Sequence, residues 1–432
     1  MAQSLKIIRI QPTLSRILIV AVALVCVLAT WFSIKWHFAS AVAPTFDRNL
    51  PESPLIAEML LGIAPGDPQV HTAVAVTFER TFNAADLDRS LREYEFAVYT
   101  SPYDYTKWLG LGRARSVNGD AAGGETAFKR ALELAPNYAA VHWAYGNFLV
   151  RQNRIAEGFG LIARAAGSDP EYARVAAVTA LEIFDGNVDQ ALGALGASDA
   201  SNAALQTALF ASGRHDDAVN AWSRISDDGK QTKYLQSSEK LAADLIGLKK
   251  FGPAARALAF LRPAGEAPVA GQIANGEFES GLKMRGAGAF EWQIAEGSAP
   301  QIGMGENSPH AGKYDLAVIF NSFEAAAFRN ISQTVVVIPG ANYELRGYYK
   351  SDVKTAASLH WEVANAATTG TIAKSGSLVP AAVWTPITVK FAAPNDADGV
   401  IVRFTREGCS GPSCPTNGII SFDSFSIQRL DQ

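Results

Sequence analysis

The chain has 432 residues, of which 48% are hydrophobic and 19% charged, and its formal net charge is -4. This composition excludes disordered, collagen-like and coiled-coil proteins, and the length suits roughly three domains. A near-neutral charge gives no electrostatic indication of nucleic-acid binding. Three cysteines are too few for a disulfide scaffold.

The first element is an apolar segment at residues 17–34, which carries no charged side chain. As a helix it would rise about 27 Å, close to the thickness of the hydrocarbon core of a bilayer. Lys6, Arg9 and Arg16 precede it without an acidic residue. The positive-inside rule therefore places residues 1–16 in the cytoplasm and the bulk of the chain across the membrane.

We expect a transmembrane helix over residues 17–36. The alternative is a signal peptide cleaved near Ala41, although this apolar segment is longer than a usual h-region. Residues 37–68 contain five prolines, and this spacing of helix breakers predicts a tether.

The exported part is predicted to contain two domains of different secondary structure. Residues 69–262 are rich in alanine and have a helical period, whereas residues 273–432 contain short alternating runs of β-branched and aromatic residues. Residues 263–272, which contain prolines and glycines, form the expected linker.

The helical half contains an internal repeat. Pro68, Pro102, Pro136 and Pro170 are each separated by 34 residues. In the best unit, residues 106–137, the order is Trp108, Leu111, Gly112, Gly119, Phe128, Ala131 and Pro136. This order resembles the tetratricopeptide repeat (TPR), with Arg115 and Gly124 departing from the family pattern. Gly112 would allow two antiparallel helices to pack closely, and Pro136 would end the second helix.

The TPR resemblance implies a concave groove, lined by the first helix of each pair, that binds a peptide or a protein. Arg113, Trp143 and Asn147 fall at repeated groove positions and would share one patch with Arg151. These four are the predicted partner-binding residues. The alternative is that they are ordinary solvated or packed helix residues. The paired lysine and asparagine of the carboxylate clamp are absent from the repeats.

The C-terminal half is predicted to be an antiparallel β-sandwich. Strand patterns occupy residues 314–320, 332–338, 343–351, 358–363, 387–391, 400–404 and 419–427. Trp361 alternates with polar neighbours on the same side as Leu359 and Val363, so we expect it in the core. Tyr348 shares its face with charged residues and is the better candidate for exposure.

Three motifs of this half resemble the jelly-roll carbohydrate-binding modules, which have a galactose-binding-like fold. They are residues 275–281 with Trp292, residues 337–343 with Gly347, and residues 422–427. The resemblance implies a structural calcium ion held by Glu279 and Asp423, although two carboxylates are few for Ca²⁺. The alternative is that Asp423 accepts backbone hydrogen bonds. It also implies sugar binding on an exposed aromatic, for which Tyr348 is the candidate.

Cys409 and Cys414 lie in the sequence CSGPSC. In an oxidising exported compartment we expect a local disulfide that closes this loop. The spacing is not that of a CxxC redox motif.

No catalytic template matches the chain, and its histidines do not show metal-ligand spacing, so we expect a protein that is not an enzyme. No cofactor is expected apart from the calcium ion. The layout resembles bacterial inner-membrane proteins associated with exopolysaccharide export. It implies a single-pass scaffold of the cell envelope, whose repeats bind a protein and whose sandwich binds polysaccharide or protein. The alternative is a carbohydrate-active enzyme with its site in the sandwich.

Overall fold

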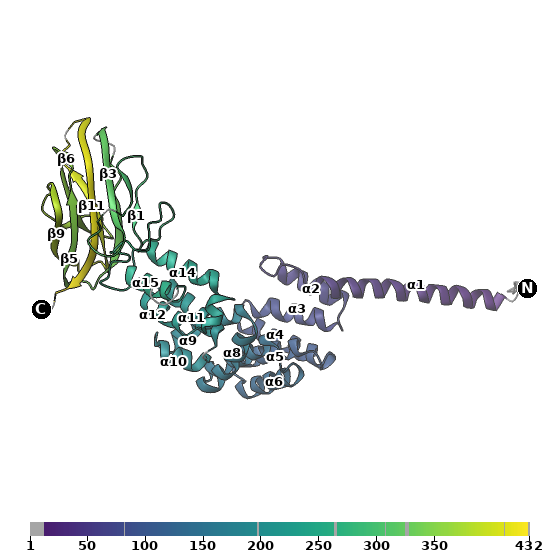
Figure 1. Ribbon diagram of the computed structural model, residues 1–432. Helices are drawn as coiled ribbons and strands as arrows, with labels where there is room; N and C mark the ends of the chain where they lie inside the picture. The colour runs from purple at the N-terminus through teal and green to yellow at the C-terminus, as the bar shows by residue number, and fades with distance from the viewer. Residues whose placement is uncertain are drawn as a thin grey trace, which may run out of the picture. The chain divides into compact units, whose positions relative to one another are not determined.

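The computed structural model describes residues 13–81, 83–196, 198–262, 266–306, 308–324, 328–409 and 411–430 (Figure 1). Lys6 and Arg9, on which the predicted topology depends, lie outside these ranges. The fold is one apolar helix, an all-α solenoid and a jelly-roll β-sandwich, as predicted. Its internal contacts divide the chain into two compact units, Met1–Ala204 and Leu205–Gln432.

Helix α1 (Thr13–Val42) extends beyond both ends of the predicted transmembrane segment. Its stretch Ser15–Val42 is strongly apolar and is long enough to cross a bilayer. The large apolar side chains from Ile17 to Phe38 are exposed. By length and composition this helix suits a membrane anchor, and a signal sequence meets the same criteria.

The segment expected to be a tether is packed instead. The last turns of α1 lie against α2 (Ser53–Ile63) and α3 (Pro68–Glu79), and the small side chains of Ala39, Ala43 and Ala57 are fully buried there. The prolines do not prevent this, because Pro54 and Pro68 occupy the first turns of α2 and α3, where no backbone N–H is needed.

The repeats form antiparallel helix pairs in the first unit. The pairs are α3 with α4 (Ala84–Thr100), α5 (Tyr105–Val117) with α6 (Ala121–Leu134), α7 (Ala139–Arg151) with α8 (Ile155–Ser168), and α9 (Pro170–Ile183) with α10 (Val188–Leu195). Pro102 and Pro136 lie between pairs, and Pro170 begins α9, so the 34-residue spacing marks the start of each unit. Aspartate or asparagine side chains cap most of these helices.

Glycine permits the close helix crossings, as expected. A Cβ atom at Gly112 would lie 3.0 Å from the ring of Phe128, which is fully buried. A Cβ atom at Gly146 would lie 2.8 Å from the carbonyl oxygen of Gly158. The repeat therefore predicts correctly where the helices of a pair cross.

Four helices of the second unit precede the sandwich. They are α12 (His215–Ser223), α13 (Asp227–Gln231), α14 (Leu235–Gly247) and α15 (Phe251–Ala259), while α11 (Asp199–Ala211) spans the boundary between the units. Asp398 of the sandwich accepts hydrogen bonds from the N–H groups of Phe251 and Gly252 at the start of α15. Phe251 also packs edge-on against Phe290. The last helices therefore join the sandwich in one unit, whereas the sequence placed a domain boundary at residues 263–272.

The sandwich consists of two antiparallel sheets. Sheet A has the order β1-β4-β10-β7-β8, and sheet B has the order β2-β3-β11-β5-β9, with β6 paired to β11. The strands are β1 (Gln293–Ile294), β2 (Gln301–Gly305), β3 (Asp315–Glu324), β4 (Ile331–Val336), β5 (Asn342–Ser351), β6 (Lys354–Thr355), β7 (Ser358–Asn365), β8 (Thr371–Lys374), β9 (Ala381–Ala392), β10 (Gly399–Glu407) and β11 (Ser413–Arg429).

All seven predicted strands are present. The sequence missed β1, β2, β6 and β8, which are short and lack a clear alternation of polar and apolar residues. Trp361 is fully buried between the sheets, with its ring centroid 4.5 Å from that of Phe425. Its predicted core position is confirmed.

Candidate functional site

Three of the predicted partner-binding residues form one stripe along α7. Trp143, Asn147 and Arg151 are separated by four residues each, so they share a helix face. Trp143 is half-buried, with its ring centroid 5.4 Å from that of Tyr172 on α9. The amide of Asn147 donates to the carbonyl of Trp143 at 2.8 Å, which orients it along its own helix.

Arg113 lies on α5, the first helix of the preceding pair. Its Nε atom is 3.7 Å from Oε1 of Glu79 on α3, and its side chain is 45% exposed. The guanidinium is therefore engaged in an ion pair between successive first helices. Glu79 is the less exposed partner, at 22%, and its other oxygen accepts a hydrogen bond from the hydroxyl of Tyr94.

The repeats also present a row of aromatic side chains, of which the sequence analysis identified only Trp143. Tyr105 and Tyr138 have ring centroids 5.0 Å apart, and the contact between Trp143 and Tyr172 continues the row on the next two first helices. Tyr138 is 57% exposed. Tyr138 and Tyr172 each follow a repeat proline by two residues, so this repeated position was the available signal. We call Tyr105, Tyr138, Trp143 and Tyr172 the aromatic row.

Tyr348, the predicted sugar contact, lies in an aromatic cluster on sheet B. The exposed ring of His310 stacks on it at a centroid distance of 3.8 Å, which leaves Tyr348 half-buried rather than exposed. Trp384 meets His310 edge-on at 5.8 Å, and the Nζ atom of Lys350 lies 5.4 Å from the centroid of the Trp384 ring. His310 is thus the exposed ring of this group, whereas Tyr348 and Trp384 are both half-buried. We call these four residues the aromatic cluster.

Asp423 positions the backbone of His310 through hydrogen bonds. Its fully buried carboxylate accepts hydrogen bonds from the N–H groups of His310 and Ala311, at 2.8 and 2.9 Å. The sequence contains no signal for this contact, because it joins residues 113 positions apart. Asp423 therefore holds the loop that carries the exposed imidazole.

Glu279 holds the other side of the same loop. Its Oε1 atom accepts hydrogen bonds from the N–H groups of Tyr314 and Lys313, and these bonds hold the pKa of Glu279 below its usual range. Both oxygens of Asp423 also accept N–H groups. The pair alone supplies too few free oxygens for the six to eight ligands of Ca²⁺. Calcium binding at these residues stays a prediction.

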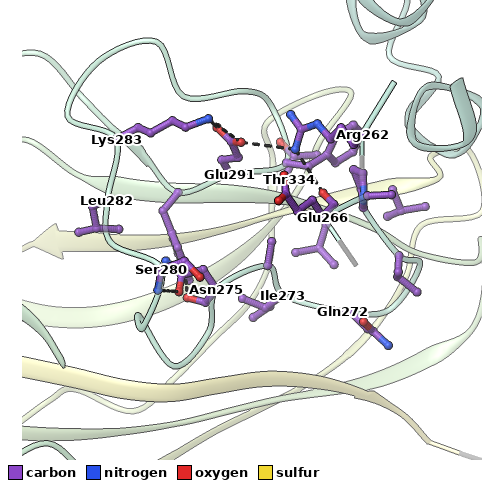
Figure 2. A pocket seen from close by; sticks show the side chains of 18 of the residues that line it. Arg262, Glu266, Gln272, Ile273, Asn275, Ser280, Leu282, Lys283, Glu291 and Thr334 are labelled. Atoms are coloured by element: carbon purple, nitrogen blue, oxygen red, sulfur yellow. Dashed lines mark hydrogen bonds and ion pairs between the residues drawn. The ribbon is translucent and has the colours of Figure 1, made fainter. Parts of the chain in front are cut away.

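A cavity of about 610 Å³ lies beside sheet A, within the size range of small-molecule sites (Figure 2). Three of its charged side chains are paired with one another. Glu291 accepts from Lys283 at 2.9 Å and lies 3.4 Å from Arg262. The charges of Lys283, Glu291 and Arg262 therefore compensate one another.

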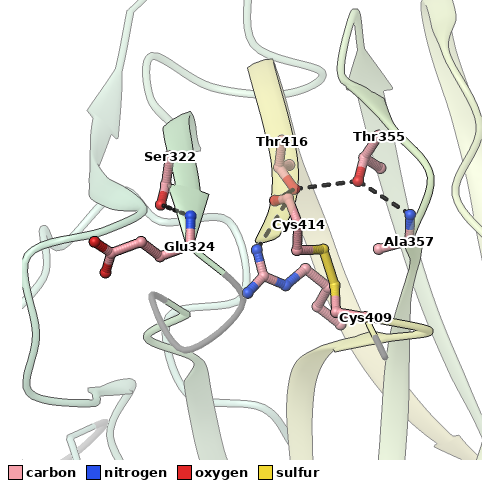
Figure 3. Close-up of a disulfide and its surroundings, with 8 residues drawn as sticks. Ser322, Glu324, Thr355, Ala357, Cys409, Cys414 and Thr416 are labelled. Atoms are coloured by element: carbon pink, nitrogen blue, oxygen red, sulfur yellow. Dashed lines mark hydrogen bonds between the residues drawn. A yellow bond between two sulfur atoms is a disulfide. The ribbon is translucent and has the colours of Figure 1, made fainter. Parts of the chain in front are cut away.

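The expected disulfide is present. Cys409 and Cys414 are bonded, with their Cα atoms 5.6 Å apart, and they connect the end of β10 to the start of β11 (Figure 3). Beside them the hydroxyls of Thr355 and Thr416 are hydrogen-bonded at 3.1 Å. Cys414 is buried. The bond therefore closes a loop between two strands and fulfils a structural role.

No protein-family model and no curated protein matches the chain. Among solved structures, a module titled "CBM4 structure and function" is 14% identical, covers 37% of this chain and 99% of its own, and gives a TM-score of 0.29. A structure of MamA is 11% identical and covers 40% of this chain and 83% of its own, with a TM-score of 0.24. TmCBM61, solved in complex with β-1,4-galactotriose, is 14% identical over 37% of this chain and 97% of its own, with a TM-score of 0.26. Each of these structures is similar to one part of this chain.

Proposed function

We propose that the protein is a single-pass, non-catalytic scaffold of the bacterial cell envelope, anchored by α1. Its repeats bind an envelope protein, its sandwich binds polysaccharide, and exopolysaccharide export is the process it serves. The observation that carries this proposal is the continuity of α1. Its exposed apolar part leads without a break into turns that are buried against α2 and α3. An anchor built in this way fixes the repeats at the membrane surface instead of suspending them on a flexible tether.

The aromatic row and the α7 stripe support a protein partner for the repeats. Half-exposed tyrosine and tryptophan side chains give large contact areas at low cost in conformational entropy. Arg113 and Arg151 flank this surface and favour a partner segment that carries carboxylates. An extended or helical peptide with aromatic or aliphatic anchors and acidic flanks fits this description.

The aromatic cluster supports sugar binding by the sandwich. Aromatic faces pack against the apolar face of a pyranose, and neighbouring polar groups fix its orientation. Trp384 and His310 supply the rings, and Lys350 and the hydroxyl of Tyr348 supply polar groups at the same place.

Topology is tested by reporter fusion after Gln432. A reporter that is active only outside the cytoplasm should work at this position. Activity of a cytoplasm-specific reporter there would overturn the proposed orientation. Recovery of a shortened chain from the soluble envelope fraction would show that α1 is cleaved as a signal peptide.

Sugar binding is tested with the full chain in lipid nanodiscs on a polysaccharide array. We expect binding that Trp384→Ala abolishes and that Val383→Ala leaves intact, since Val383 is exposed beside Trp384 but lies outside the cluster. Loss of binding in both variants, or in neither, would remove the aromatic cluster as the site. Turnover of a polysaccharide in the same samples would favour the alternative function of a carbohydrate-active enzyme.

A further inference from the structure

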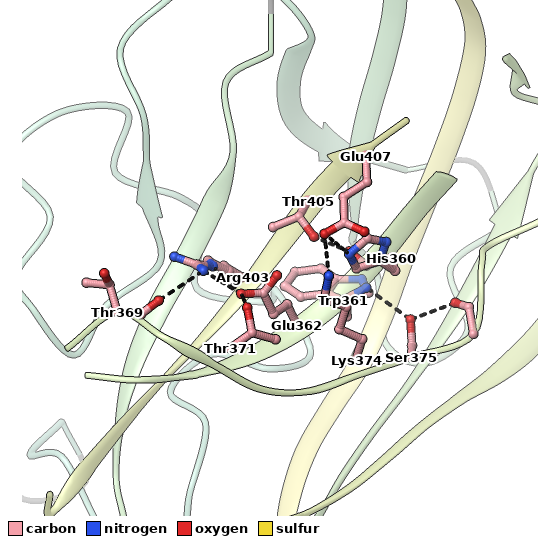
Figure 4. Close-up of polar contacts among 11 residues, drawn as sticks. His360, Trp361, Glu362, Thr369, Thr371, Lys374, Ser375, Arg403, Thr405 and Glu407 are labelled. Atoms are coloured by element: carbon pink, nitrogen blue, oxygen red, sulfur yellow. Dashed lines mark hydrogen bonds and ion pairs between the residues drawn. The ribbon is translucent and has the colours of Figure 1, made fainter. Parts of the chain in front are cut away.

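A group of polar side chains lies on the face of sheet A opposite the core (Figure 4). His360 and Glu362 alternate along β7 with the buried Trp361, so their side chains emerge on the other face. On the adjacent strand β10, Thr405 is the register partner of His360, and Glu407 follows two residues later on the same face. One ligand atom from each of His360, Glu362 and Glu407 lies within 4.8 Å of the other two.

The buried imidazole of His360 has a nitrogen without a partner, which indicates that this group binds a ligand. His360 is only 4% exposed, and its Nε2 atom has no hydrogen-bond partner among the described residues. Nε2 points toward Oε1 of Glu407 at 3.7 Å, which is too long for a hydrogen bond. A buried polar atom without a partner is costly, so a ligand for this nitrogen is expected.

The separation of these two atoms suits a metal ion between them. Zinc bonds of about 2.1 Å to nitrogen and oxygen, at a tetrahedral angle, place the ligand atoms about 3.4 Å apart. The observed 3.7 Å is close to this value.

Glu362 is held in place by side chains on neighbouring strands. Its Oε1 atom accepts hydrogen bonds from Thr371 at 2.7 Å, from Nε of Arg403 at 3.0 Å, and from Nη2 of the same guanidinium, with which it forms an ion pair. Such outer contacts fix a coordinating carboxylate while its other oxygen binds the ion. Oε2 of Glu362 has no described donor, so it is the oxygen we assign to the metal.

We propose that His360, Glu362 and Glu407 bind one Zn²⁺ ion on this face of sheet A. A nitrogen ligand with two carboxylates favours zinc over Ca²⁺ and Mg²⁺, which prefer all-oxygen shells. Three protein ligands leave a fourth position open to water or to a ligand oxygen. Lys374 forms an ion pair with Oε1 of Glu407 and must move away when zinc binds. Its place on the edge strand β8 leaves it room to turn into solvent.

The test is a zinc titration of the full chain in detergent, made without a polyhistidine tag and stripped with a chelator. We expect one Zn²⁺ per chain by calorimetry and by metal analysis after dialysis. His360→Gln and Glu407→Gln should each weaken binding at least tenfold. Lys374→Met should strengthen it severalfold, because it removes the competing cation.

His71→Gln is the matched control, since His71 is also buried but both of its ring nitrogens already have partners in Glu93 and Pro65. This variant should bind zinc like the wild type. Glu407 is half-exposed, so Glu407→Gln keeps the test valid if His360→Gln fails to fold. Absence of zinc binding by the wild type, or binding unchanged in both ligand variants, would overturn the proposal. Weaker binding by Lys374→Met would contradict the assignment of Glu407.

Discussion

Replacing Gly146 with alanine measures how closely α7 and α8 are packed. The new Cβ would lie 2.8 Å from the carbonyl oxygen of Gly158 and 2.8 Å from Cγ1 of Ile162. The oxygen belongs to the backbone of α8 and cannot turn aside as the end of a side chain could, so the two helices must separate. Overpacking of this kind costs about 1–3 kcal/mol, while the change from glycine to alanine within a helix gains about 1 kcal/mol.

Gly160→Ala in α8 separates these two effects. No atom lies within 4 Å of a Cβ built at Gly160, so this variant gains the helix propensity without overpacking. We expect Gly160→Ala to raise stability by about 1 kcal/mol. Gly146→Ala should be about 1–3 kcal/mol less stable than Gly160→Ala, because the propensity gain is common to both variants.

The assay is thermal unfolding of the full chain in detergent, followed by the far-UV circular dichroism of the helices. For a unit of this size, each kcal/mol moves the Tm by roughly 2–4 °C. Gly160→Ala should therefore have a clearly higher Tm than Gly146→Ala. Equal melting temperatures would refute the crossing of α7 and α8 at Gly146.

Asp398→Ala should lower the stability of the second unit by about 1 kcal/mol in thermal unfolding, the usual cost of losing an N-cap, because Asp398 accepts from two N–H groups of α15. Side-chain hydrogen bonds from Lys129 and Arg154 lower the pKa of Glu125 to about 2. Since this folded pKa lies below the unfolded value of 4.5, the stabilisation is present above pH 4.5 and is lost as the pH falls toward 2. Glu125→Gln should remove that part of the acid dependence in unfolding measurements. In the unfolded chain, thiol labelling should find one free cysteine before reduction and three after it.

Matched controls accompany these three predictions. Asp396→Ala changes an exposed aspartate beside Asp398, and a loss of stability as large as that of Asp398→Ala would argue against the cap. Glu133→Gln changes another ion-paired glutamate of α6, which is 64% exposed, and is the matched substitution for Glu125→Gln. Labelling of all three cysteines without reduction would disprove the disulfide.

The sequence alone determined the features that arise from local patterns. A run of uncharged apolar residues predicts the membrane-length helix, prolines at a fixed interval predict the repeat, and alternation predicts the seven main strands. Gly112 and Trp361 could be assigned because a helix crossing and a buried strand face each repeat with the period of their own element. These patterns depend on residues that are close together in the chain, so they can be recognised without the tertiary structure.

Tertiary structure decided the features that depend on residues distant in the chain. Asp398 caps a helix that begins 147 residues earlier, and this contact joins the last helices to the sandwich across the predicted linker. His310 covers Tyr348 because Asp423, over a hundred positions away, holds its loop. Strand register likewise brings His360 near Glu407, although their linear spacing gives no metal motif. Local pattern sets which face a side chain occupies, whereas only the fold of the whole chain sets what lies opposite it.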